Sequence, residues 1–125
     1  MRLFSTVVTA VSPEARELMA GGVLILFAEG APPELAEVSV LHRMTSPPAA
    51  DPPAAGATLM FGGISTRLTA IGDKAWAKIA DIGHVVVYFN GATVAPRPGE
   101  ISVAPVDLAA LSAALAPGAV IVIDA

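Results

Sequence analysis

The sequence predicts a mainly β fold: a compact barrel or pseudo-barrel of about seven or eight short strands with two or three short peripheral helices. Its apolar runs are short and rich in β-branched residues, and Gly or Pro separates them at close intervals. The helical patterns between these runs are too short and too few for a doubly wound parallel sheet. At 125 residues, the chain is expected to form a single domain spanning residues 1–125.

The first elements follow from local signals. Leu3–Val11 is β-branched and predicts a strand. Ser12-Pro13-Glu14 predicts the start of a helix, because Ser caps free N–H groups, Pro suits the first helical position and Glu complements the helix dipole. Gly21-Gly22 ends that helix, and the continuous apolar run Val23–Phe27 predicts a buried strand.

A turn at Glu29–Pro33 leads into one helical turn at Glu34–Glu37 and a strand over Val38–His42. The Pro/Ala-rich stretch Met44–Gly56 cannot continue a sheet, because proline lacks the backbone N–H that a strand ladder needs. We therefore expect a loop there.

The second half begins with a hairpin, in which Ala57–Phe61 and Ile64–Ile71 flank Gly62-Gly63. Asp73–Ile82 predicts an amphipathic helix that Asp73 caps and Gly83 ends, with Trp76 packing in the core. The remaining expectations are strands at Val85–Phe89, Glu100–Ala104 and Ala119–Ile123, and a helix from an Asp107 cap to Leu115.

Composition excludes several classes of protein. The chain is 54% hydrophobic with a mean hydropathy of +0.70, yet no run approaches the roughly 20 apolar residues needed to cross a bilayer. The N-terminus lacks a signal-peptide pattern, so we expect a cytoplasmic protein without direct membrane insertion. A net charge of −4 with scattered basic residues argues against nucleic acid, and the absence of cysteine excludes disulfides and thiolate chemistry.

His42 is the first candidate for chemistry. Residues i and i+2 of a strand share a face, so Val38, Val40 and His42 are expected to line one side. At the end of a strand, this imidazole would be walled by apolar groups yet reach solvent, with a neutral nitrogen free to attack. From spacing alone, an ordinary surface or half-buried histidine is the simpler interpretation.

His84 opens the run His84–Phe89 and is the second histidine of the chain. It is either a structural histidine at the end of a strand or a partner that hydrogen-bonds His42 or an anion on it. Neither histidine has metal-ligand spacing with an acidic residue, so no metal site and no cofactor are expected. Arg43 and Arg67 are expected to be solvated, although a guanidinium could also help to hold a phosphoryl group.

Two blocks resemble a known family. Leu24–His42 (LILFAEGAPPELAEVSVLH) is similar to the glucitol/sorbitol-specific enzyme IIA component of the bacterial phosphotransferase system. In that family a strand, an F-x-E-G-A-P turn, an acidic helical turn and a second strand lead to the phosphoryl-accepting histidine. Leu68–Gly91 resembles the family's T-A-[IV]-G motif, helix and G-H strand, and Pro98–Pro105 and Pro117–Asp124 match more weakly. The residues in register in the first block are Phe27, Glu29, Gly30, Ala31, Pro32, Leu35, Glu37 and His42.

The resemblance implies a phosphotransferase with a phosphohistidine intermediate. His42 would take a phosphoryl group from the phosphocarrier HPr and pass it to the IIB component of the IIB/IIC transporter, for uptake of sorbitol or a related polyol. His84 would orient His42 or contact the phosphoryl group. The alternative is a non-catalytic regulatory or small-ligand-binding β-barrel module with the same fold. The sequence departs most from the family pattern after the acceptor, over Arg43–Gly56.

Overall fold

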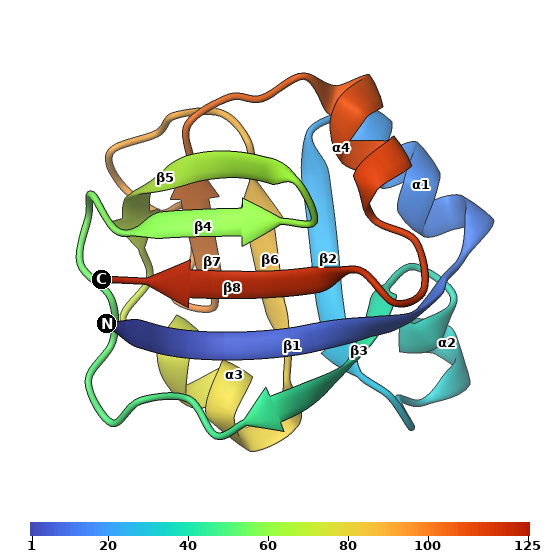
Figure 1. Cartoon of the computed structure of the whole chain (residues 1–125), viewed down its shortest axis with the longest axis horizontal. Helices are drawn as coiled ribbons and strands as arrows, with labels where there is room; N and C mark the ends of the chain where they lie inside the picture. The colour runs from blue at the N-terminus through green and yellow to red at the C-terminus, as the bar shows by residue number, and fades with distance from the viewer.

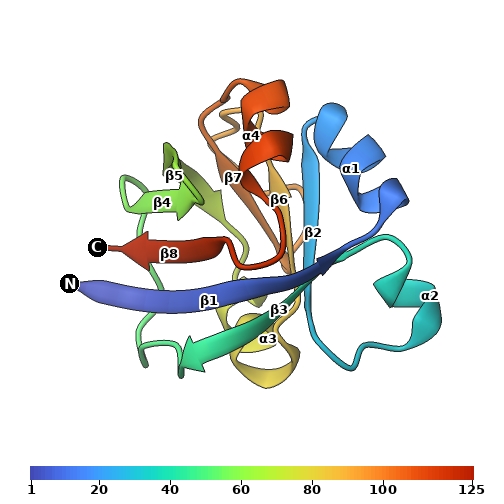
Figure 2. The same cartoon turned by 45° about the vertical axis from the view of Figure 1, so that its right-hand side comes forward.

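The computed structural model describes residues 1–125 and contains eight strands and four short helices joined by loops (Figures 1 and 2). The strands are β1 (Arg2–Val11), β2 (Val23–Ala28), β3 (Val40–Ser46), β4 (Thr58–Phe61), β5 (Ile64–Ile71), β6 (Val85–Tyr88), β7 (Glu100–Val103) and β8 (Val120–Asp124). The helices are α1 (Pro13–Ala20), α2 (Pro33–Ala36), α3 (Ala75–Ile82) and α4 (Leu108–Ala114). None of the four helices is long and apolar enough to cross a bilayer.

The eight strands form a closed barrel in the order β1-β3-β2-β6-β7-β5-β4-β8. The pairs β2–β3 and β6–β7 are parallel, and the other six pairs are antiparallel. The front strands β1, β4 and β8 cross the direction of β2, β6 and β7 behind them (Figure 1). The predicted mainly β barrel is therefore confirmed. The helical turn predicted at Glu34–Glu37 is present as α2, one residue earlier, and brings the number of helices to four.

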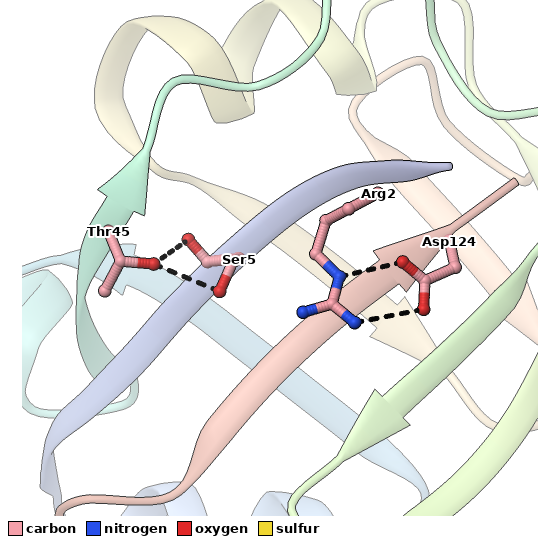
Figure 3. A network of polar contacts seen from close by, with 4 residues as sticks. All are labelled: Arg2, Ser5, Thr45 and Asp124. Atoms are coloured by element: carbon pink, nitrogen blue, oxygen red, sulfur yellow. Dashed lines mark hydrogen bonds and ion pairs between the residues drawn. The ribbon is translucent and has the colours of Figure 1, made fainter.

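The barrel's long strand, β1, pairs with β3 on one side and β8 on the other. Side chains reinforce both pairings (Figure 3). Arg2 donates to the Asp124 carboxylate from Nε at 2.9 Å and from Nη2 at 3.4 Å. Thr45 donates from Oγ1 to the backbone oxygen of Ser5 at 3.1 Å and to its Oγ at 3.0 Å.

The inward-facing side chains form one apolar cluster of 24 buried residues. Trp76 of α3 belongs to this cluster and packs edge-on against Phe4, with ring centroids 6.3 Å apart. Its indole Nε1 donates to the backbone oxygen of Ala49 at 2.7 Å, which fixes the Pro/Ala-rich loop against α3. Trp76 is thus a core residue, as predicted, and also a loop anchor.

The local signals at two helix starts are confirmed. Ser12 Oγ accepts from the backbone N–H of Ala15, and Asp107 Oδ1 accepts from that of Ala110, both at 3.0 Å. The prediction that Asp73 caps the third helix is wrong. Lys74 occupies the cap position of α3, and no side chain caps that helix end.

The predicted strand over Val38–His42 is wrong in its limits, because β3 begins at Val40 and continues to Ser46. The backbone N–H groups of Val38 and Ser39 still bond back to Leu35 and Ala36, so the chain leaves the helical turn late. Beyond His42, the ten-residue β1 offers a pairing partner as far as Ser46. The strand ends where Pro47 removes the next backbone donor.

Candidate functional site

His42 lies in the middle of β3, between β1 and β2. Val8 of β1 is its antiparallel partner and Ala28 of β2 its parallel partner. The imidazole is 1% exposed, on the same buried face as Val40. The expectation that His42 ends its strand and reaches solvent is therefore wrong for this conformation, because β3 runs on for four residues and the ring faces the barrel interior.

Both ring nitrogens of His42 are hydrogen-bonded. Nδ1 lies 2.6 Å from Oγ1 of Thr6, and Nε2 lies 2.7 Å from the backbone oxygen of Gly83. A carbonyl oxygen only accepts, so Nε2 carries a proton and donates it to Gly83. In the neutral ring Nδ1 then has the lone pair and accepts from the Thr6 hydroxyl. These two bonds define both the tautomer and the orientation of the ring.

The environment keeps the imidazole neutral. Burial lowers the pKa of His42 below its ordinary value, while the hydrogen bond to Gly83 and the charge of Glu29 act in the opposite direction. Edge-on packing against Phe4, with ring centroids 6.3 Å apart, adds to the apolar wall. A neutral ring retains a lone pair, which a nucleophile requires.

Gly83 shapes the other side of the site. It ends α3 in the left-handed conformation at φ +65°, as predicted from the sequence. A Cβ at this position would lie 2.8 Å from the Cβ of Ala28 and 3.1 Å from Nε2 of His42. Only glycine lets the helix end approach the ring closely enough for the carbonyl bond.

His84 follows Gly83, but its ring does not contact that of His42 through a hydrogen bond. Its Nδ1 lies 3.2 Å from the backbone oxygen of Leu26 and donates to it, and its ring packs at a tilt of 39° against Phe27, with centroids 4.9 Å apart. His84 also lines a surface pocket, together with Lys74, Lys78 and Arg97. The structure therefore joins the two histidines through the backbone of Gly83 and not through their rings.

The turn that carried the family resemblance lies directly beside His42. Glu29 donates its backbone N–H to the backbone oxygen of His42 at 2.8 Å. Arg43, the next residue of β3, is exposed, and Arg67 donates from Nη1 to the backbone oxygen of Gly56 at 3.2 Å. Neither arginine is hydrogen-bonded to the His42 ring, whose partners are Thr6 and Gly83.

The sequence interpretation missed Thr6 and the role of the Gly83 carbonyl. Thr6 lies within a β-branched run, where nothing in the pattern separates it from its neighbours. The strand register places it two residues from Val8, the direct partner of His42, and therefore on the same face. The described residues contain no group of three or more metal-ligating side chains.

Comparisons with known proteins match almost the whole chain. The family model for the glucitol/sorbitol-specific IIA component of the phosphotransferase system matches residues 3–122. Proteins named as glucitol/sorbitol-specific EIIA components from Shigella flexneri and from Escherichia coli strain K12 are each 30% identical to this chain over 102 residues. That alignment covers 82% of this chain and 81% of each relative.

A solved structure has the same fold. The crystal structure of a phosphotransferase system IIA component from Enterococcus faecalis V583 superposes with a TM-score of 0.70. The superposition covers 94% of this chain and 96% of that one, at 18% sequence identity. The barrel described above is therefore an architecture that an experimentally determined protein adopts.

Proposed function

Because this chain belongs to the glucitol/sorbitol-specific IIA component family of the phosphotransferase system, whose members are phosphoryl-transfer components, we propose that His42 is its phosphoryl acceptor. In this proposal His42 receives the phosphoryl group from HPr and passes it to the IIB component, in the cytoplasm. The relay supports uptake and phosphorylation of glucitol/sorbitol or a related polyol, as the names of the relatives indicate.

The observation that carries the proposal is the environment of the His42 ring. It is a buried, neutral imidazole whose two nitrogens each have a single defined partner. Phosphoryl transfer depends mainly on positioning and on charge stabilisation, so a nucleophile held in one orientation suits the reaction. In the transfer, the P–N bond of the donor phosphohistidine breaks as a new P–N bond to His42 forms. The donor imidazole leaves with the electron pair.

Nε2 is the nitrogen we propose as the acceptor. Nδ1 contacts Thr6, a side chain with no exposed surface, so a donor protein has no route to it from that side. Nε2 contacts the end of α3, beside Ile82, which is 42% exposed. Transfer then requires the Gly83 turn to move away from the ring and the ring proton to reside on Nδ1.

His84 has a positioning role in this proposal. Its hydrogen bond to Leu26 and its packing against Phe27 hold the segment that carries the Gly83 carbonyl. Loss of the His84 ring should loosen the Gly83–His42 contact without removing the acceptor. This differs from a direct contact between the two imidazoles.

The test is to incubate the protein with phosphoenolpyruvate, enzyme I and HPr and to measure an acid-labile phosphoryl adduct by intact mass. The unmodified protein should gain one phosphoryl group, and His42→Gln should gain none. His84→Gln is the matched control, because it removes the other imidazole of the chain and should retain acceptance at a reduced rate. Absence of an adduct with several competent HPr proteins would refute the proposal, and an adduct on His42→Gln would refute the site.

A further inference from the structure

We infer that Thr6 is a positioning residue for phosphoryl transfer, because it holds His42 in place through both tautomers that the reaction needs. The inference rests on the proposed function of His42. Thr6 is fully buried, and its Oγ1 lies 2.6 Å from Nδ1 in a bond that is itself buried. This is the closest side-chain contact of the site.

The two partners of the imidazole differ in what they can do. The Gly83 carbonyl only accepts, so it serves only a ring that is protonated on Nε2. The Thr6 hydroxyl can rotate, so it donates to a bare Nδ1 and accepts from a protonated Nδ1. When the Gly83 turn opens, solvent takes the proton from Nε2 and supplies one to Nδ1, so the ring stays neutral and Thr6 is the partner that remains.

The barrel wall defines the position of this hydroxyl. Thr6 is inward-facing on β1, and its strand pairs with both β3 and β8. A register shift in the β1–β3 pairing falls between Ser5 and Thr6, and another lies between Val8 and Ala10. These irregularities bracket the residues that face His42 and increase the local twist of the strand.

The hydrogen bond between Thr6 and Nδ1 determines whether Nε2, the proposed acceptor, has a free lone pair. With Nδ1–H bonded to Thr6, the lone pair of the imidazole is on Nε2, the nitrogen that lies against the end of α3. Without the hydroxyl, a protonated Nδ1 would be a buried donor with no partner, which disfavours that tautomer. Thr6 therefore favours the nucleophilic form without contacting the phosphoryl group.

The experiment compares Thr6→Val, which removes the hydroxyl at nearly constant shape, with Thr6→Ser, which keeps it. We expect Thr6→Val to lower the rate of phosphoryl transfer from HPr by about tenfold or more, and Thr6→Ser to restore it to within about threefold of the unmodified protein. The matched control is Thr66→Val. Thr66 is 7% exposed and donates to the backbone oxygen of Ala104 at 2.8 Å, so this variant also loses a hydroxyl hydrogen bond, but away from His42.

A second readout does not depend on turnover. In the unphosphorylated protein, ¹⁵N chemical shifts of the His42 ring report the tautomer, and we expect Thr6→Val to change them while Thr66→Val does not. A transfer rate for Thr6→Val equal to that of the unmodified protein, or an equal loss in Thr66→Val, would overturn the inference. Unchanged ring shifts in Thr6→Val would also overturn it. If the unmodified protein accepts no phosphoryl group, the proposed function fails, and the ring shifts still report whether Thr6 positions His42.

Discussion

The backbone oxygen of Gly83 accepts a hydrogen bond from Nε2 of His42 at 2.7 Å, although the two residues are 41 positions apart in the chain. This contact places the end of α3 against Nε2 of the proposed acceptor, while Thr6 of β1 contacts the other ring nitrogen. It accounts for three features together: the orientation of the ring, the tautomer in the closed conformation and the need for glycine at position 83.

Gly83→Ala should destabilise the protein more than a glycine replacement that only strains the backbone. Both Gly83 and Gly22 have positive φ, at +65° and +88°, but a Cβ on Gly22 meets no atom within 4 Å. We expect Gly22→Ala to cost about 1–2 kcal/mol for the left-handed conformation, and Gly83→Ala to cost about 1–3 kcal/mol more for the contacts with Ala28 and His42. Urea unfolding of both variants measures the difference, and equal losses would contradict the packing described for Gly83.

The stability of the protein should depend on pH through His42. Burial lowers the pKa of His42 in the folded state, so between that value and about 6.5 the unfolded chain binds a proton that the folded protein does not. This contribution is therefore complete above about pH 6.5 and decreases as the pH falls below it.

The measurement is the free energy of unfolding between pH 7.5 and pH 5 for the unmodified protein and for His42→Asn. The variant should lose less stability over this range, because it has no ring to protonate. Leu41→Met serves as the control, since it changes the neighbouring residue of β3 without altering any titrating group. A pH dependence in His42→Asn as steep as that of the unmodified protein would show that His42 is not the group responsible.

Phosphorylation should occur on Nε2 of His42. The reason is geometric, because Nδ1 faces a fully buried threonine while Nε2 faces the helix end beside an exposed isoleucine. Phosphorus and nitrogen NMR of the phosphorylated protein distinguishes the two phosphohistidine isomers. A product phosphorylated on Nδ1 would contradict the opening of the Gly83 turn and require a route through the barrel wall.

Trp76→Phe should release the Pro/Ala-rich loop while leaving the barrel folded. The change keeps an aromatic ring in the core but removes the Nε1 donor to Ala49, at a cost of about 1 kcal/mol. Ala49 also donates its backbone N–H to Leu3, so faster hydrogen exchange at this amide reports loosening of the loop. Exchange at the paired amides of β4 and β5 is the internal control and should remain close to that of the unmodified protein.

The barrel could be predicted because its signals are local. Short β-branched runs, the Gly62-Gly63 hairpin and the Ser12 and Asp107 caps each depend on residues close in sequence. The end of β3 could not be predicted in this way, because its last residues are stabilised by pairing with β1, about 40 residues away. Arg43 and Thr45, followed by prolines, are typical of a loop when the sequence is considered without its pairing partner β1.

The site was predictable only in part for the same reason. His42 could be singled out from the family resemblance, and the Glu29 turn does lie against its backbone. Its partners could not be predicted from the sequence. Thr6 lies beside His42 because β1 pairs with β3, and Gly83 because α3 packs on the barrel. The direction of the His84 ring likewise depends on β2, because the backbone oxygen of Leu26 accepts a hydrogen bond from its Nδ1.

Helix α3 connects two contacts that lie far apart in the sequence. Trp76 near its start holds the Pro/Ala-rich loop at Ala49, and Gly83 at its end holds the imidazole. A movement of the whole helix away from the barrel must break both bonds, so the frequency of such openings depends on how firmly the loop is attached. If α3 moves as a unit when Nε2 is exposed, the loop in which this chain departs most from its family pattern would set how often the buried imidazole reaches a partner.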